Sequence, residues 1–175
     1  MKIYFTLILL FLLVSCTSTK VYMDYDNKAD LESYKTYSYF LAPENGLNDL
    51  DNKRVLRVLD SVLPKKGLTQ KTISDLNIIY YAEIYTVENQ NNIGIGVGGG
   101  NRGFGGGVSS GIPIKTSKDM IAFTLEFVDG LNKELFWQAV VETRITSDNT
   151  PEGRQALFRE IIIKALEKYP PEKND

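Results

Sequence analysis

The feature that most restricts how this chain can fold is a run of glycines near its middle. Ten of the fourteen glycines lie between Gly94 and Gly111, in the stretch GIGVGGGNRGFGGGVSSG. Because glycine loses more backbone freedom on folding than any other residue, such a stretch is costly to order. We therefore expect residues 93–111 to form a flexible loop, or a long frayed hairpin, between two strands.

Within this loop, Gly94, Gly96 and Gly99 satisfy the G-x-G-x-x-G pattern of dinucleotide-binding turns. That pattern requires a helix to begin at its last glycine, where backbone N–H groups meet the pyrophosphate. More glycines follow here instead, so we expect no nucleotide and no other cofactor. Scattered apolar residues remain as contact points, and Arg102 beside Phe104 is the pair that we expect to touch a protein or membrane partner.

The first residues, MKIYFTLILLFLLVSC, are organised like an export signal. Lys2 and the amino terminus are positive, and residues 3–14 form an almost entirely apolar run. A membrane-spanning helix needs about 20 such residues, whereas a signal peptide needs about 7–15. Residues 1–15 are therefore expected to be a signal peptide.

The end of this run, Leu13-Val14-Ser15-Cys16, resembles the lipobox of bacterial lipoproteins. The resemblance implies cleavage before Cys16 and attachment of a diacylglyceryl group to it. The alternative is an ordinary secretory signal with a leftover thiol, but Cys16 is the only cysteine in the chain. Two acyl chains hold a protein firmly on a membrane without a spanning helix.

The residues after Cys16 bear on where such a lipoprotein would reside. Thr17 stands where many lipoproteins of the inner membrane have aspartate, and no acidic cluster follows at once. The resemblance therefore implies the outer membrane, facing the periplasm. Residues 16–20 are expected to be a short lipidated tether that keeps the folded body close to the membrane.

Composition excludes several kinds of chemistry. The chain has no histidine and one cysteine, which removes Ser-His-Asp triads, Cys-His dyads, histidine-ligated metals and intrachain disulfides. With 20 Lys+Arg against 22 Asp+Glu, the net charge of −2 provides no general positive field for nucleic acid. We expect no catalytic residue, no metal site and no nucleic-acid partner.

Hydrophobic periodicity predicts one folded domain over residues 21–170, followed by a tail at 171–175. Period-two alternation and β-branched or aromatic runs predict strands, and three-to-four spacing with capping residues predicts helices. The expected strands are residues 21–26, 34–41, 76–87, 120–128 and 134–146. Asp49 or Asp51 is expected to cap the first helix, and residues 147–150 are expected to cap the second, with Pro151 in its first turn. The order β-β-α-β-β-β-α predicts an α+β fold, an antiparallel or mixed sheet of about five strands with two helices on one face.

Particular residues have expected roles within these elements. The last three strands should form an antiparallel set, with Asp129 and Gly130 in a hairpin turn. Trp137 should belong to the core. The second helix should end near Tyr169 and bury a set of apolar residues, namely Ala156, Leu157, Ile161, Ala165 and Leu166.

Paired carboxylates are the one remaining source of acid–base chemistry. Asp24 and Asp26 lie two apart on a predicted strand and therefore share a face. Such a pair could divide its pKa values for catalysis, but acids at the end of a strand are more often solvated or form turns. We expect the second role for these two residues.

Three stretches of the chain together resemble the DUF4136 lipoproteins, a family of bacterial envelope proteins. They are residues 21–26 followed by 34–39 (VYMDYD and YKTYSY), residues 123–137, and the closing helix ending Tyr169-Pro170-Pro171. Tyr39 stands where the family more often has tryptophan. The resemblance implies an α+β fold and no catalytic residues.

These observations favour a lipid-anchored envelope protein that acts as a non-catalytic binding or structural module, with an envelope protein as its partner. Two alternatives remain. A carrier of lipids or lipopeptides would need an apolar cavity between sheet and helices. A carboxylate-dependent enzyme acting on glycans would need two carboxyl groups about 5–10 Å apart in a pocket.

Overall fold

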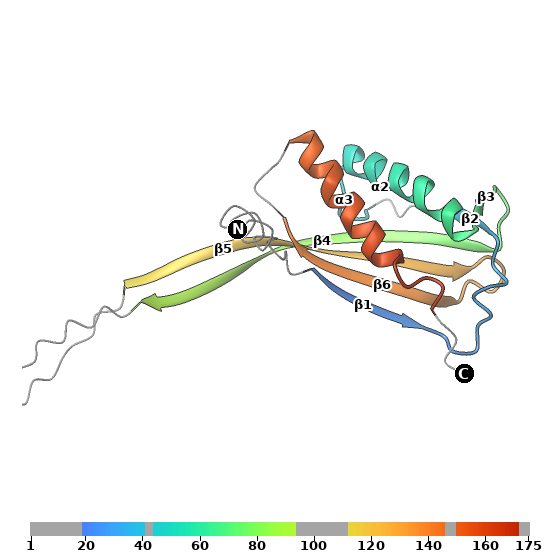
Figure 1. The fold of residues 1–175 in the computed structure, drawn as a ribbon, viewed down its shortest axis with the longest axis horizontal. Coiled ribbons are helices and arrows are strands. Elements are labelled where there is room, and N and C mark those ends of the chain that lie inside the picture. Colours follow the sequence, from blue (N-terminus) through green and yellow to red (C-terminus); the bar gives the residue numbers. More distant parts are fainter. Residues whose placement is uncertain (1–18, 41–43, 94–111, 146–149, 172–175) are drawn as a thin grey trace, which may run out of the picture.

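The computed structural model describes residues 19–40, 44–93, 112–145 and 150–171, with the backbone alone at 89–93 and 112–116. These residues form a mixed six-stranded sheet with two helices side by side on one face (Figure 1). The predicted α+β class, with both helices on one face, is confirmed. The sheet has one strand more than expected, a short edge strand.

The strands are β1 (Lys20–Tyr25), β2 (Thr36–Tyr39), β3 (Thr69–Gln70), β4 (Leu76–Ile93), β5 (Ile112–Asp129) and β6 (Leu135–Arg144). The helices are α2 (Asp49–Val62), a short 3₁₀ helix (Leu63–Lys66) and α3 (Pro151–Leu166). The strand order is β1-β6-β5-β4-β2-β3. The predicted antiparallel set of β4, β5 and β6 is confirmed, β1 joins antiparallel to β6, and β2 is parallel to both β3 and β4.

Helix α2 begins at Asp49, but its cap is Asn48 rather than the predicted Asp49 or Asp51. The Asn48 side chain accepts a hydrogen bond from the Asp51 amide, and the Thr150 side chain accepts one from Gly153. Pro151 occupies the first turn of α3, where a missing N–H costs nothing. Helix α3 ends at Leu166 rather than near Tyr169 as predicted. Ala156 is predicted to be buried but is exposed, because it lies on the side of α3 that faces solvent.

The core lies between the helices and one face of the sheet. Leu59 of α2, Phe123 of β5 and Phe158 of α3 are all fully buried there. Trp137 is also fully buried and packs on Phe127, with ring centroids 4.6 Å apart, as expected for a core residue. Aromatic residues therefore fill much of the space between the two layers.

Strands β4 and β5 are longer than the sequence predicts, each running eighteen residues. Strand β6 ends at Arg144, which pairs with Met120 of β5. Beyond this pair, the β4–β5 hairpin continues without β6 beside it. We call residues 86–93 and 112–119 the ribbon; they pair with each other over about 26 Å, at about 3.3 Å per residue. The ribbon projects from the end of the sheet at which β1 begins (Figure 1). The predicted strand ended too early because the apolar alternation stops near Val87, whereas the backbone hydrogen bonds between β4 and β5 need no apolar pattern.

Within the described residues, no helix is both long and apolar enough to cross a membrane.

Candidate functional site

A buried carboxylate lies where the first turns of α2 and α3 meet. Asp51 is only 1% exposed, although it is charged and sits in the first turn of α2. A buried charge is costly unless it is paired and hydrogen-bonded, so its neighbours decide what it can do.

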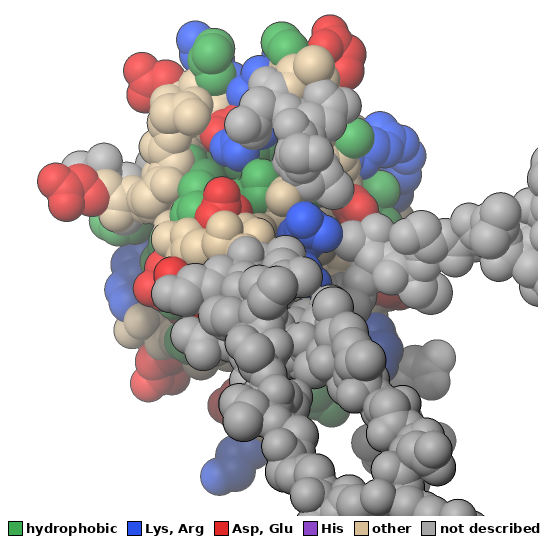
Figure 2. All heavy atoms as spheres, turned by 90° about the vertical axis from the view of Figure 1, so that its left-hand side faces the viewer, with side chains coloured by type: hydrophobic (Ala, Val, Ile, Leu, Met, Phe, Trp, Pro, Cys, Tyr) green, Lys and Arg blue, Asp and Glu red, His purple; other side chains and the backbone are tan. Residues whose placement is uncertain are grey.

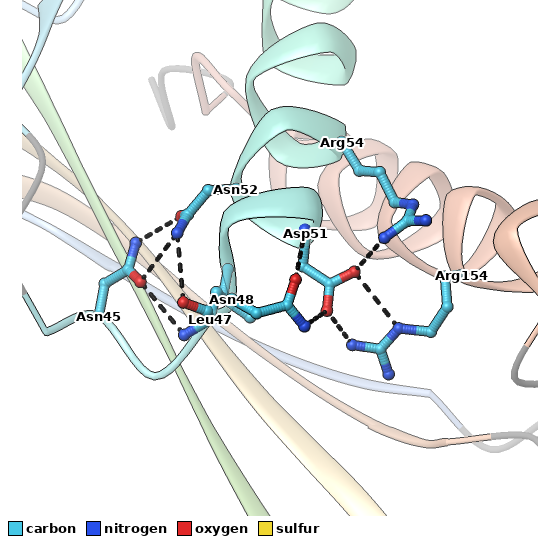
Figure 3. Close-up of polar contacts among 7 residues, drawn as sticks. All are labelled: Asn45, Leu47, Asn48, Asp51, Asn52, Arg54 and Arg154. Atoms are coloured by element: carbon cyan, nitrogen blue, oxygen red, sulfur yellow. Dashed lines mark hydrogen bonds and ion pairs between the residues drawn. The ribbon is translucent and has the colours of Figure 1, made fainter.

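The partners of Asp51 come from both helices (Figure 3). Arg54, one turn along α2, donates from Nη1 to Oδ1 over 2.7 Å. Arg154 of α3 donates from Nη2 to Oδ2 and from Nε to Oδ1. The Asn48 side-chain amide donates to Oδ2 over 2.9 Å. The carboxylate thus receives donors from both helices, and it joins one helix to the other.

This environment keeps Asp51 ionised. Burial alone raises the pKa of Asp51, but the hydrogen bonds and positive charges of Arg154 and Arg54 outweigh it, so the net pKa is lowered. The first turn of α2 contributes in the same direction, because a helix N-terminus carries partial positive charge. Asp51 is therefore suited to holding α2 against α3, and it is poorly suited to proton transfer near neutral pH.

A second polar cluster joins α2 to the sheet, and Figure 3 shows its Asn45 and Asn52 side chains. The side chain of Asn45, 5% exposed, donates to Asn52 Oδ1 over 2.7 Å, and the Tyr80 hydroxyl donates to the same oxygen over 3.1 Å. The Asn45 carbonyl accepts from the Ala82 amide of β4 over 2.8 Å. These contacts fix the segment before α2 on β4 just before the hairpin leaves the body.

Two open hollows adjoin the Asp51 cluster. One, of about 760 Å³, lies between the two helix N-termini and is lined by Asn48, Asp49, Leu50, Asp51, Arg54, Pro151 and Arg154. The other, of about 530 Å³, lies along the helix pair and is lined by Arg54, Arg57, Pro151, Glu152, Gln155, Ala156 and Arg159. Arg57 donates to the neutral Gln155 across the second hollow, over 3.2 Å. The arrangement can offer guanidinium donors to an anionic group, and it holds no arrangement typical of covalent chemistry.

The predicted lipid site, Cys16, and the predicted contact pair, Arg102 and Phe104, lie outside the described residues. Asp24 and Asp26 are both exposed. Asp26 Oδ1 accepts from the Lys28 amide in the turn after β1, as the turn-forming prediction requires. Asp24 instead lies within β1, and its Oδ1 accepts from the amide of the next residue, Tyr25. Among the described residues, no group of three or more histidine, cysteine and acidic side chains is placed to hold a metal ion.

Asp129 is a turn residue, as predicted. Its Oδ1 accepts from the Leu131 and Asn132 amides, and its Oδ2 accepts from the Tyr34 hydroxyl over 2.9 Å. The Asn132 amide, together with these other donors, lowers the pKa of Asp129. Burial, with the Asp129 carboxylate next in effect, raises the pKa of Tyr34 to about 12.

Sequence reasoning missed the Asp51 cluster. The Asp51–Arg54 pair is visible as an acid and a base three apart on a predicted helix, which is a common surface arrangement. Arg154 lies 103 residues farther along the chain, and no local pattern connects it with Asp51. The burial of Asp51 follows from that long-range contact.

The fold and its polar clusters define a class: an α+β domain whose helices cover one face of a mixed sheet and are tied together by buried polar groups. The chain belongs to the family described as "Domain of unknown function (DUF4136)", which matches residues 21–171. The predicted family is thereby confirmed.

Among solved structures, the chain is similar to a PDZ domain protein from Parabacteroides distasonis ATCC 8503, with 14% identity and a TM-score of 0.49. The match covers 90% of this chain and 38% of that one, so the chain spans well under half the length of that protein. It is also similar to PelC of Paraburkholderia phytofirmans, crystallised as a dodecamer, with 12% identity and a TM-score of 0.49. These matches cover 85% of this chain and 94–95% of the other. No curated protein matches the chain.

Proposed function

We propose that this protein is a lipoprotein of the bacterial cell envelope, held on the periplasmic face of the outer membrane by a diacylglyceryl group on Cys16. The observation that carries the proposal is the Leu13-Val14-Ser15-Cys16 pattern, which places the only cysteine directly after an apolar run of signal-peptide length. The start of β1 at Lys20 supports it, because little chain separates Cys16 from the folded body.

On this anchor, the protein acts as a non-catalytic binding or structural module. Asp51 is the described acid most suited by burial to unusual chemistry, yet two arginines hold it ionised. The carrier alternative calls for space between sheet and helices, a region that Leu59, Phe123 and Phe158 occupy. Both observations favour binding over catalysis or transport.

The anchor is tested by Cys16→Ala in cells, with fractionation and intact mass measurement. We expect the variant to lose the mass of the diacylglyceryl group and to leave the membrane fraction, because no lipid then holds it. Ser18→Ala is the matched control and should remain in the membrane. A Cys16→Ala protein that fractionates as the unsubstituted protein does would contradict the proposal.

The binding role is tested by crosslinking in cells followed by mass spectrometry. We expect one reproducible envelope protein with the native chain, and its loss with the double variant Arg102→Ala/Phe104→Ala. Asn101→Ala/Ser109→Ala, in the same glycine-rich stretch, is the control that should keep the partner. If no specific partner is captured with the native chain, the carrier and carboxylate-enzyme alternatives gain weight.

A further inference from the structure

The helices cover one face of the sheet, and the opposite face carries no layer among the described residues (Figure 1). Successive side chains of a strand point to opposite faces. Leu76, Ile78 and Tyr80 point into the core, so Tyr81 and Val87 of the same strand lie on the uncovered face.

The same alternation places two more exposed aromatic residues on that face. Tyr22 of β1 pairs with Val140, whose neighbour Val141 is in the core. Phe40 directly follows β2, and its amide donates to the Ile78 carbonyl over 2.9 Å, which continues the pairing with β4. Its neighbour Tyr39 points the other way, because the Tyr39 hydroxyl reaches Asp60 of α2. We call these residues, Tyr22, Phe40, Tyr81 and Val87, the outer-face residues; they are 53%, 63%, 40% and 38% exposed.

The last part of the predicted tether is itself held against the body. The Thr19 hydroxyl donates to Glu160 Oε1 of α3 over 3.1 Å and lies 3.0 Å from the Thr143 hydroxyl of β6. Cys16 is three residues earlier, a distance of at most about 11 Å in a fully extended chain. On the proposed function, on which this step rests, that end of the sheet is therefore within about 11 Å of the anchored cysteine.

This short reach conflicts with an upright molecule whose ribbon points into the bilayer. Lys20 pairs with Glu142, Glu142 with Ala122, and Ala122 with Glu83, so β1 begins level with Glu83. From Glu83, β4 runs to Ile93, a length of about 33 Å at about 3.3 Å per residue. In that orientation about 20 Å of ribbon would pass beyond Cys16, deeper than one leaflet of a hydrocarbon core about 30 Å thick.

The ribbon cannot enter hydrocarbon in this form. Apart from the Asp119 carbonyl, which accepts from the Ile145 amide, neither edge of the ribbon pairs with another segment in the described residues. Unpaired backbone groups are not tolerated against lipid. Glu88, Lys118 and Asp119 add charges along it. Figure 2 views the molecule along the ribbon and shows both acidic and basic side chains around this end of the body. The ribbon therefore lies either in the aqueous phase or among the lipid headgroups.

We propose that the protein lies along the membrane that holds its anchor, with the uncovered face of the sheet against the lipid headgroups. The long axis of the sheet and the ribbon then run parallel to the surface, which keeps Cys16 within reach and the ribbon out of hydrocarbon. Tyrosine and other aromatic side chains favour the boundary between headgroups and acyl chains, which suits Tyr22, Phe40 and Tyr81. The helix layer, with its arginine-lined hollows, faces the periplasm.

Two matched pairs of single-cysteine variants test this orientation. Tyr81→Cys and Ile163→Cys replace residues 40% and 43% exposed on opposite sides of the body. Val87→Cys and Ile84→Cys replace residues 38% and 50% exposed on opposite faces of the hairpin. The full lipidated protein is purified, labelled with a fluorophore at the new thiol, and placed in phosphatidylethanolamine–phosphatidylglycerol vesicles. Nitroxide lipids then quench either at the headgroup or deep in the acyl chains.

We expect headgroup quenching to be several-fold stronger at positions 81 and 87 than at positions 163 and 84. Equal quenching within both pairs would overturn the proposal, as would weak quenching at all four positions. Deep quenching at both hairpin positions would also overturn it, because the ribbon would then be inserted. Tyr22→Cys replaces Tyr81→Cys if loss of the Tyr81–Glu126 hydrogen bond prevents folding.

Failure of the anchor gives a different signal. If Cys16 carries no lipid, the purified protein lacks the diacylglyceryl mass and takes up two labels instead of one. That result contradicts the proposed function and removes the basis of the orientation with it. A lipidated protein with the wrong quenching pattern overturns the orientation alone.

Discussion

Strands β4 and β5 form one continuous hairpin, but its two halves have little in common except their backbone pairing. In the half within the body, Ile78 and Tyr80 of β4 and Phe123 of β5 are fully buried under the helices. In the ribbon, Val87 is 38% exposed and neither edge has a neighbouring strand in the described residues. A ladder of hydrogen bonds can therefore extend well beyond a core, while stability comes mainly from burial of apolar surface.

The largest expected effect is in the buried half. Phe123→Ala should reduce the free energy of unfolding by about 3–5 kcal/mol, because it leaves a cavity and removes the contact with Tyr80, whose ring centroid is 5.9 Å away. Urea unfolding followed by tryptophan fluorescence measures this. A loss of less than about 1 kcal/mol would mean that the helices do not close over this half in solution.

The next effect tests how the helices are held over the buried half. Asp51→Asn should reduce the free energy of unfolding by about 3 kcal/mol, because it removes the charge that pairs with two arginines. Asp49→Asn, an exposed acid in the same turn, is the matched control and should change it by under about 0.5 kcal/mol.

The lowered pKa of Asp51 also sets a pH dependence. A carboxyl whose pKa is lower in the folded state stabilises the fold at pH values above its unfolded pKa, near 3.9. That contribution is lost as the pH falls through the lower folded value. The unsubstituted protein should therefore lose stability below about pH 4 more steeply than Asp51→Asn does, and parallel pH profiles in urea unfolding would contradict this.

A smaller effect is expected where the hairpin leaves the body. Gly46 has a φ of +74°, and a Cβ there would lie 1.8 Å from the carbonyl oxygen of Ala82 on β4. Gly46→Ala should cost about 2–3 kcal/mol, from backbone strain together with overpacking. Gly67 has a similar φ of +83° but nothing within 4 Å, so Gly67→Ala should cost only about 1 kcal/mol. Equal losses in thermal unfolding would show that the close approach to Ala82 is not maintained.

The smallest effect is in the ribbon itself. Val87→Ala should change the free energy of unfolding by less than about 0.5 kcal/mol, because the side chain is already partly in water. Amide hydrogen exchange should also be faster in the ribbon than at Ile78 or Phe123, since local opening there exposes little apolar surface. Slow exchange in the ribbon of the isolated protein would contradict the contrast between the two halves.

Much of the fold follows from local patterns in the sequence. The alternation in β5 and β6, the cap before Pro151 and the turn at Asp129 act over a few residues, so they are readable without tertiary information. Asn48 is an equally local cap, but the prediction gave that role to Asp49 or Asp51. The failures have equally local causes. Ala156 is apolar, as a buried residue should be, but it lies on the solvent side of its helix. Strand β4 extends past the point at which its apolar pattern ends.

The candidate site divides in the same way. The lipobox at Cys16 is a linear signal that can be read directly, whereas the Asp51 cluster depends on Arg154, 103 residues away. A pair so far apart in the chain is brought together only when α2 and α3 pack side by side on the sheet.

The sequence by itself determined the family, the α+β class and the approximate position of most elements, because periodicity, caps and turns depend on neighbouring residues. The tertiary structure decided the position of β1 on β6, the burial of Asp51 between two helices, and the length of the ribbon. Each of these depends on contacts between distant segments, whose favourable packing and hydrogen bonding exist only once the whole sheet and its helix layer have assembled.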